Sequence, residues 1–326
     1  MGIFLPAGGF MTQYKNLLVV IDPDQEHQPA LLRAIDIGRK SVTSVKMTLF
    51  LAIYDFSYDV TSMLSFEERK NMQNEVVRQR QQWLSELVEL LHVKDLQIGL
   101  QVVWHNRPYE AMIAQIYEGH HDLLIKATHD HATLGSVIFT PTDWHLLRKS
   151  PVPVLLVKEH GWPENGKILT AVNLSSDNEI HEALNDKLIV ESKKMSQFLN
   201  AEVNLVNAYP ATPVNVTIEL PEFDPATYTD AVRGHHLLAM KALRQKHCID
   251  EENTFCEEGV PENVIPDIAA ELNAGLVILG TTGRIGLSAI FIGNTAEHTI
   301  DQLNCDVLAI KPDGYISPLD PAVKQQ

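Results

Sequence analysis

The sequence predicts an α/β fold made of two tandem domains, each with a five-stranded parallel sheet. The chain has 326 residues, which suits two domains at about 150 residues each. Short apolar runs alternate with amphipathic segments, the pattern of a parallel sheet that is covered by helices on both faces. The order of these segments in the first half returns in the second half. We therefore expect one α/β unit to occur twice.

The first half contains five apolar runs that read as buried strands. They are Lys15–Asp22, Met47–Ile53, Gln97–Trp104, Asp122–Ile125 and Val154–Val157. The segments between them predict helices at Gln28–Lys40, from Ser65 onward, at Pro108–Tyr117 and at Thr142–Arg148. Ser65 and Glu68 have the spacing of a capping box, so the long helix is expected to begin there.

The second half repeats this order. The runs that match strands one, two, four and five are Ile168–Asn173, Glu202–Ala208, Leu276–Leu279 and Val307–Ile310. Turn-forming residues in Glu159–Gly166 mark the boundary between the halves. We expect a first domain over residues 11–159, a linker at 160–166 and a second domain over 167–313. Residues 1–10 are expected to be a non-native leader, and residues 314–326 a loose tail.

Composition narrows the classes of partner. The formal charge is −16, from 42 acidic and 26 basic residues, and such a field repels nucleic acid and anionic membrane surfaces. No apolar run approaches the roughly 18 residues of a membrane helix. Three cysteines without metal-ligand spacing are typical of a protein in the reducing cytoplasm. We therefore expect a cytoplasmic protein that binds neither nucleic acid nor membrane.

A glycine-rich stretch, Gly280–Glu297, follows the fourth strand of the second half. Glycines allow backbone N–H groups to approach a ligand closely, and a helix is expected to begin at Asn294, with Glu297 as the second member of a capping box. A strand, a glycine loop and a helix start together indicate a phosphate cradle. The alternative is an ordinary strand-to-helix loop. Arg284, the one cation of the loop, could neutralise a phosphate or be a solvated loop residue.

Longer motifs resemble a known family. The segments Phe139–His145 and Ile218–Pro225, together with the tandem organisation, are similar to the universal stress protein family in its tandem form, closest to the bacterial branch called universal stress protein E. The resemblance covers nearly all of Lys15–Pro312. It implies an adenine-nucleotide alpha-hydrolase-like fold with strand order 3-2-1-4-5 and a cytoplasmic role in stress. It also implies that the two halves form an internal pseudo-dimer.

The same resemblance implies an ATP site in the second half. One branch of the family binds ATP through Gly-x2-Gly-x9-Gly-Ser/Thr, and three glycines of this chain have that spacing. Asn replaces the Ser/Thr, and an Asn also stands at the end of strand one, where the family has Asp. A small residue at the end of strand two is expected to line the base. The candidate residues are Asn173, Ala208, Gly280, Gly283, Arg284, Gly293, Asn294 and Thr295, with Mg²⁺ as the ion that accompanies ATP.

The first half lacks these glycines. Laid over the second half without a gap, it has Lys126, His129 and Phe139 at the three glycine positions. It retains Asp22, the aspartate at the end of strand one. We therefore expect the first half to block the close approach of a triphosphate, so that the glycine loop is lost in one half and kept in the other.

Two other clusters have simpler interpretations. Histidines and aspartates gather around the fourth strand of the first half, but their spacing matches no standard zinc site, so we expect polar loop residues and no metal. They are His120, His121, Asp122, His129, Asp130 and His131. Asp143-Trp144-His145 has no nearby nucleophile, and we interpret it as a helix cap with packing residues.

The function expected from these features is that of a non-catalytic stress-response protein with an ATP site in its second domain. The alternative is a scaffold or small-ligand-binding stress protein in which both sites are degenerate. A homodimer or a separate protein partner is compatible with either. An ATP-hydrolysing enzyme is a third hypothesis, and no catalytic base beside the glycine loop supports it.

Overall fold

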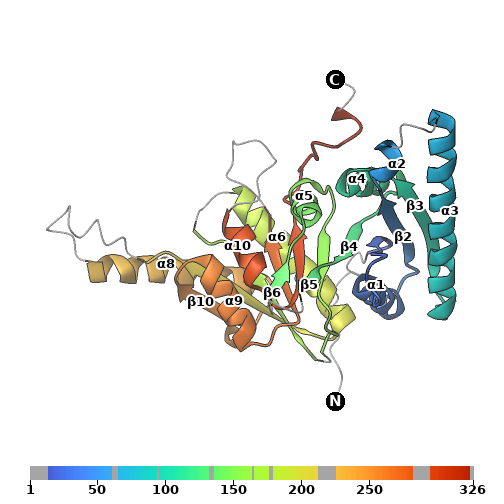
Figure 1. Ribbon diagram of the computed structural model, residues 1–326. Coiled ribbons are helices and arrows are strands. Elements are labelled where there is room, and N and C mark those ends of the chain that lie inside the picture. The colour runs from blue at the N-terminus through green and yellow to red at the C-terminus, as the bar shows by residue number, and fades with distance from the viewer. Residues whose placement is uncertain are drawn as a thin grey trace, which may run out of the picture.

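The computed structural model has one continuous sheet of ten strands, with helices on both faces (Figure 1). The structure describes residues 14–60, 65–93, 95–131, 136–163, 165–175, 179–211, 225–281 and 294–323. Predictions for residues 1–13 and for most of the glycine loop, residues 282–293, therefore lie outside the described residues.

The first domain has the predicted strand order. Its strands are β1 (Asn16–Val20), β2 (Lys46–Ile53), β3 (Gln97–Trp104), β4 (Leu123–Ala127) and β7 (Val154–Val157). They lie in the order β3-β2-β1-β4-β7, and neighbours are parallel. The order 3-2-1-4-5 is confirmed. Because the order reverses between β1 and β4, the helices that follow these two strands leave toward opposite faces.

The second domain repeats the arrangement. Its strands are β8 (Lys167–Ala171), β9 (Glu202–Tyr209), β10 (Thr254–Glu258), β11 (Leu276–Gly280) and β12 (Asp306–Ile310). Their order, β10-β9-β8-β11-β12, is again 3-2-1-4-5. The reversal falls between β8 and β11.

The two halves join through their fifth strands. β12 pairs antiparallel with β7, and Leu308 lies opposite Leu155. Each of these strands would otherwise be a sheet edge with unpaired backbone groups, and their pairing satisfies them. The two five-stranded sheets that were predicted are therefore one sheet.

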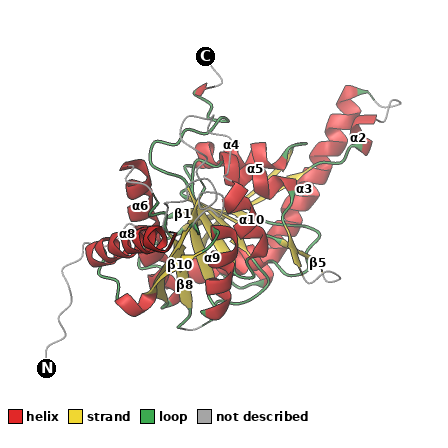
Figure 2. Ribbon diagram, turned by 90° about the vertical axis from the view of Figure 1, so that its left-hand side faces the viewer, coloured by secondary structure: helices red, strands yellow, loops and turns green. Residues whose placement is uncertain are grey.

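The helices form two layers. One face carries α1 (Pro29–Lys40), α3 (Phe66–Leu90), α6 (Glu179–Leu199) and α8 (Pro225–Lys246), and the other carries α4 (Pro108–Gly119), α5 (Pro141–Lys149), α9 (Pro261–Glu271) and α10 (Asn294–Gln302). Successive β1 residues face opposite layers: Leu17 and Val19 pack in one core, and Leu18 in the other. This explains why the strands are continuous apolar runs. The long α3 extends well beyond the sheet (Figure 2).

Helix starts follow the capping signals. Ser65 and Glu68 form the predicted capping box of α3, with the Glu68 N–H donating to Ser65 Oγ at 3.2 Å. A second capping box begins α5, between Thr140 and Asp143. At the start of α10 the Asn294 side chain lies outside the described residues, and Glu297 contacts Arg148 of the first domain.

β10 (Thr254–Glu258) was not located from the sequence, and four further short elements were not predicted. They are β5 (His129–His131), β6 (Ser136–Ile138), α2 (Ser57–Val60) and the 3-10 helix at Glu251–Asn253. β5 and β6 pair as a hairpin between β4 and α5, at the place that the glycine loop takes in the second-domain sequence.

The C-terminal tail is partly anchored. Tyr315 donates from its hydroxyl to the Arg148 carbonyl oxygen at 2.7 Å, and Ser317 donates to the Lys149 carbonyl oxygen at 2.6 Å. The expectation of a loose tail is therefore wrong for these residues, because the end of α5 provides unpaired carbonyl groups that they satisfy.

Candidate functional site

Three described candidate residues of the second domain lie at one edge of the sheet. Asn173 follows β8, Ala208 is near the end of β9, and Gly280 ends β11. The three strands are parallel neighbours, so their carboxyl ends meet. Asn294 and Thr295 begin α10, although their side chains lie outside the described part, as do Gly283, Arg284 and Gly293 altogether. The described part of the site is thus brought together at the reversal of strand order.

Asn173 builds the turn after β8. Its Oδ1 accepts the Ser175 N–H at 3.0 Å, and its backbone exchanges two hydrogen bonds with the Asn185 side chain, at 3.0 and 2.8 Å. The side-chain oxygen of an Asx residue commonly closes such a turn. Asn173 is exposed beyond these contacts.

Asp22 does the same after β1. Its Oδ1 accepts the Asp24 N–H at 2.9 Å, and its backbone exchanges hydrogen bonds with the Gln28 side chain, at 3.2 and 2.6 Å. The two domains therefore have one turn in common, made with Asp in the first and Asn in the second. Asn in place of Asp removes a charge at this edge and retains the geometry.

Gly280 has a packing reason to be glycine. A Cβ at this position would lie 2.8 Å from Leu184 Cδ2 of α6, which is closer than such atoms approach. The absence of a side chain lets α6 pack on the end of β11. Close approach to a phosphate is thus one of two explanations for this residue.

The ungapped comparison of the halves was wrong by one residue. Gly280 lies opposite Ile310 in β12, and the matching pair in the first domain is Ala127 with Val157. Ala127 therefore occupies the place of Gly280, and Lys126 is one position earlier. The alignment of the two halves is decided by the register of β4 with β7 and of β11 with β12. The ungapped comparison of the sequences did not contain this information.

A buried lysine lies beside the start of the glycine loop. Lys311 Nζ donates to the Thr281 carbonyl oxygen at 2.9 Å. Burial lowers the pKa of Lys311 to about 7, and the nearby Arg148 charge adds to the shift. The ammonium is therefore only partly protonated at neutral pH.

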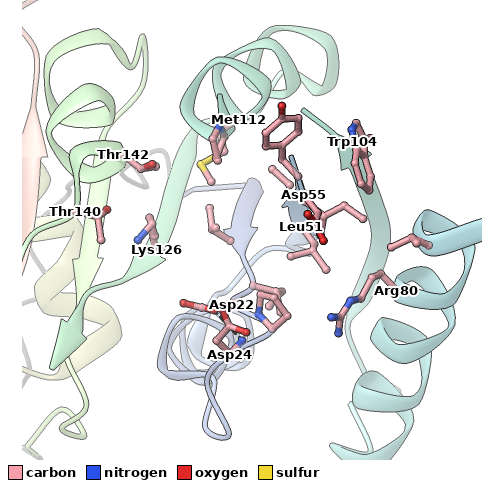
Figure 3. Close-up of a pocket in the computed structure, with 18 of the residues that line it drawn as sticks. Asp22, Asp24, Leu51, Asp55, Arg80, Trp104, Met112, Lys126, Thr140 and Thr142 are labelled. Carbon is pink, nitrogen blue, oxygen red and sulfur yellow. Dashed lines mark hydrogen bonds between the residues drawn. The ribbon is translucent and has the colours of Figure 1, made fainter. Parts of the chain in front are cut away.

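The first domain contains a cavity of about 540 Å³ at the corresponding edge (Figure 3). Residues at and after the ends of β1 and β2 line it, with others from α2, α3, β3, α4, β4 and α5. Its apolar lining includes Val20, Ile21, Leu51, Ala52, Ile53, Val76 and Met112. Ala52 matches Ala208 by strand register, since Met47 and Val203 are the partners of Leu17 and Ile168. The small residue expected beside a base is thus present in both domains.

Lys126 lines the α5 side of this cavity and forms an ion pair with Asp143, which lies outside the lining. Lys126 Nζ lies 2.8 Å from Asp143 Oδ1, and it also donates to the Ala127 carbonyl oxygen at 2.9 Å. Asp143 is fully buried, and its Oδ2 accepts the Thr140 N–H and hydroxyl, both at 2.7 Å. The lysine charge is thus compensated inside the protein.

Acidic groups also line the cavity. Asp22, Asp24 and Asp55 line the cavity together with the exposed Arg80 guanidinium. Hydrogen bonds from Ser57 lower the pKa of Asp55, so its carboxyl group is ionised at neutral pH. In Figure 3, Lys126, Thr140 and Thr142 lie on one side, and Arg80 with Trp104 on the other.

Aromatic rings complete the mouth. Trp104 meets Tyr54 and Tyr58 edge-on, with centroid distances of 6.0 and 5.3 Å. Sequence reasoning missed these residues, as well as Arg80 and Lys126, because it searched for glycines. The usable signal for Tyr54, Trp104 and Lys126 was that each lies at or just after the end of a first-domain strand at the same edge, whereas Arg80 comes from the middle of α3.

The remaining sequence clusters have structural roles. His145 stacks on Tyr109 at 4.0 Å, and Trp144 packs against Phe139 at 5.3 Å, which agrees with their interpretation as packing residues. The interpretation of the histidines as polar loop residues is wrong for His121, which is buried with a lowered pKa, and for His129 and His131, which lie in strand β5. Within the described ranges, no three His, Cys, Asp or Glu side chains are arranged to hold a metal ion.

Comparison with known proteins explains the repeated fold. The sequence profile of the universal stress protein family matches residues 13–158 and again residues 165–311. The chain belongs to the universal stress protein family. It is a tandem member of this family, because the two matches lie in succession on one chain.

The similar proteins share the whole tandem organisation. Universal stress protein E of Salmonella typhi and of Escherichia coli (strain K12) are each 54% identical over 311 residues, which cover 95% of this chain and 98% of theirs. The universal stress protein E homolog of Haemophilus influenzae is 43% identical over 303 residues, covering 92% and 98%.

Solved structures agree on the fold. A protein of Pseudomonas aeruginosa UCBPP-PA14, described as a universal stress protein, aligns with a TM-score of 0.71 at 29% identity over 95% of this chain and 98% of its own. A universal stress protein from Archaeoglobus fulgidus aligns with a TM-score of 0.63 at 14% identity, covering 92% and 99%. In the described part of this universal stress protein, no helix has the length and apolar character needed to cross a bilayer.

Proposed function

We propose that this tandem universal stress protein binds ATP, accompanied by Mg²⁺, in its second domain. The site consists of Asn173, Ala208, Gly280, Gly283, Arg284, Gly293, Asn294 and Thr295. The protein acts in the cytoplasm as a stress-response factor, and its response follows from occupancy of this site rather than from catalysis.

The observation that carries this proposal is the convergence of Asn173, Ala208 and Gly280 at the reversal of strand order. In open α/β sheets, ligands bind outside the carboxyl ends of the strands at this point. α10 begins at Asn294, after the loop, and a helix N-terminus favours an anionic group. The spacing of the three glycines adds a loop whose backbone can approach phosphate closely.

Five of the candidate residues have an assigned part. Ala208 leaves room for a flat ring near the end of β9, and the Asn173 side chain can hydrogen-bond a hydroxyl without adding a charge. Gly283 and Gly293 allow backbone approach, and Arg284 neutralises phosphate charge together with Mg²⁺. No step of hydrolysis is proposed, since the sequence places no general base beside the loop.

Titration calorimetry with Mg-ATP tests the proposal. The wild-type protein should release or absorb heat with saturation, and Gly283→Val should lose it because a branched side chain keeps the backbone from the phosphates. Gly161→Val is the matched control, since a Cβ at Gly161 meets nothing within 4 Å. Absence of binding in the wild type, or equal binding by Gly283→Val, would contradict the site.

A second function is supported by a different observation. Gly280 is required by Leu184, and the Asn173 side chain already closes a turn, so two site residues have purely structural explanations. This favours a scaffold or small-ligand-binding stress protein with no nucleotide. Nucleotide that remains bound through gentle purification of the wild type, and is lost from Gly283→Val, would count against it.

We also propose that the two halves act as an internal pseudo-dimer. The antiparallel pairing of β7 with β12 joins the two halves, so neither fifth strand lies at an edge of the sheet. Light scattering after size-exclusion chromatography should give the mass of one chain, about 36.5 kDa. A mass of two chains at low micromolar concentration would indicate a further homodimer.

A further inference from the structure

Neighbouring cations hold the two segments that border the glycine loop. Lys311 follows β12, and its Nζ donates to the carbonyl oxygen of Thr281, where β11 leads into the loop, at 2.9 Å. Arg148, in the last turn of α5, donates to the carboxylate of Glu297, in the first turn of α10, which follows the loop. Lys311 belongs to the second domain, whereas Arg148 comes from the first.

The Arg148–Glu297 ion pair crosses the boundary between the domains. Both Nε and Nη2 of Arg148 donate to the same carboxylate oxygen, Glu297 Oε1, and the Nε–Oε1 distance is 3.1 Å. The two side chains are only 29% and 27% exposed, so solvent screens their charges in part. The first domain thus places one guanidinium at the first turn of α10.

The C-terminal tail holds Arg148 in place. The Tyr315 hydroxyl donates to the Arg148 carbonyl oxygen at 2.7 Å, and the Tyr315 ring centroid lies 4.9 Å from Lys311 Nζ. Burial lowers the pKa of Lys311 to about 7, and the nearby Arg148 charge adds to the shift. The Arg148 charge therefore acts on an ionisable group at each border of the loop.

Arg148 has no cationic counterpart in the second domain. α5 and α10 each have nine residues, and the eighth is Arg148 in α5 and Asp301 in α10. Lys158, which matches Lys311 by strand register, donates to the Leu303 carbonyl oxygen. The first domain therefore supplies a guanidinium to the helix after the glycine loop, and α10 supplies none to α5.

Glu297 carries a negative charge at the end of α10 that would meet a phosphate. A helix N-terminus attracts anions through its N–H groups and its dipole. An unpaired carboxylate in the first turn would repel an incoming phosphate by Coulomb interaction. Arg148 cancels that charge, so the attraction of the helix N-terminus for an anion remains.

We propose that the first domain completes the nucleotide site of the second domain by supplying Arg148, which neutralises Glu297 and so permits a triphosphate to bind at α10. Arg148 acts through Glu297 and does not contact the ligand. This inference rests on the proposed function, because it concerns the same site. It gives a role to the first domain, which lacks the glycine loop, since ATP binding then depends on its α5.

Removal of one charge or the other should change the ATP affinity in opposite directions. Titration calorimetry with Mg-ATP on the full chain should show about tenfold weaker binding by Arg148→Met, equal to about 1.4 kcal/mol, because Glu297 is then uncompensated. Glu297→Gln leaves the guanidinium uncompensated, and this variant should bind ATP about threefold more tightly than the wild type.

The double variant Arg148→Met/Glu297→Gln separates charge from packing. It lacks the ion pair and has no net charge at this place, so its ATP affinity should lie within about twofold of the wild type. If the pair served only to hold α5 against α10, the double variant would bind ATP as weakly as Arg148→Met, and this result would overturn the proposal. Arg78→Met is the matched control, because Arg78 pairs with Glu75 on the exposed surface of α3, and it should not change the affinity.

The outcomes separate this inference from the proposed function. Absence of ATP binding by the wild type would overturn the proposed function and this inference with it. ATP binding that is equal in the wild type and in Arg148→Met would overturn the inference alone. If Arg148→Met unfolds, which circular dichroism detects, Glu297→Gln still decides, since it keeps the size of the side chain. An unchanged or weaker ATP affinity in Glu297→Gln would overturn the proposal.

Discussion

Arg33 of α1 and Asp306 at the start of β12 form an ion pair between the two domains, with Nε and Oδ2 2.8 Å apart. Their side chains are 4% and 0% exposed. Arg33 also donates to the His160 carbonyl oxygen at 2.7 Å and lies 4.2 Å over the Trp162 ring. Asp306 accepts the Lys158 N–H at 2.9 Å. One buried pair thus fixes the linker and the junction of the sheet.

Removal of Arg33 should destabilise the protein strongly. In Arg33→Ala the Asp306 carboxylate remains buried without its cation, and such a loss costs about 3–5 kcal/mol of the free energy of unfolding. Urea denaturation measures it. Arg39→Ala is the matched control, since its ion pair with Asp95 is about half exposed, and it should cost less than about 1 kcal/mol. Similar costs for both variants would contradict the role given to the buried pair.

Lys311 should make stability depend on pH. Its pKa is lowered from 10.5 to about 7. Between these values the unfolded chain holds one more proton than the folded protein, so this group makes the free energy of unfolding rise with pH by about 1.4 kcal/mol per unit. Below pH 7 its contribution is constant.

The variant Lys311→Met should remove this slope. The difference in the free energy of unfolding between wild type and Lys311→Met should therefore change steadily from pH 7 to pH 9. Lys40→Met, at an exposed position, should show a constant difference. Parallel curves for wild type and Lys311→Met would mean that Lys311 titrates normally.

Gly280→Ala should test the packing explanation for this glycine. The added Cβ would lie 2.8 Å from Leu184 Cδ2, and overpacking of this kind costs about 1–3 kcal/mol. Thermal unfolding of Gly280→Ala should show this loss. In a protein that already carries Leu184→Ala, the same Gly280→Ala substitution should cost less, because the side chain that the new Cβ would meet is gone. Additive effects of the two substitutions would show that the contact is not the cause.

Replacement of Asn173 by a charged Asp should leave stability almost unchanged, whereas replacement by an apolar Leu should lower it. Asn173→Asp keeps an oxygen for the Ser175 N–H, so stability should change by less than about 0.5 kcal/mol. Asn173→Leu removes that hydrogen bond and should cost about 0.5–1.5 kcal/mol. Chemical denaturation of both variants decides this. A large loss in Asn173→Asp would mean that the turn needs the amide itself.

Local signals in the sequence were sufficient for most of the fold. Four consecutive apolar residues identified β1 and β7, because strands buried on both faces need apolar side chains on both. The capping-box spacing of Ser65 and Glu68 located the start of α3. The strand order came from the family resemblance, and the register confirmed it.

Contacts distant along the chain were not predictable in this way. Arg33 and Asp306 lie on separate domains, and nothing local to either residue indicates the other. Lys126 and Asp143 lie on β4 and α5, and no local signal pairs them. The strand register corrected the overlay of Gly280 from Lys126 to Ala127. The hairpin β5–β6 was missed because its strands are only three residues long.

We propose that the two domains have diverged, so that the second keeps a phosphate loop and the first has the Lys126–Asp143 ion pair in its place. Native mass spectrometry with Mg-ATP counts the nucleotides bound to each chain. We expect one ATP per chain in the wild type and none in Gly283→Val. Two ATP molecules per chain, or one that persists in Gly283→Val, would contradict the account.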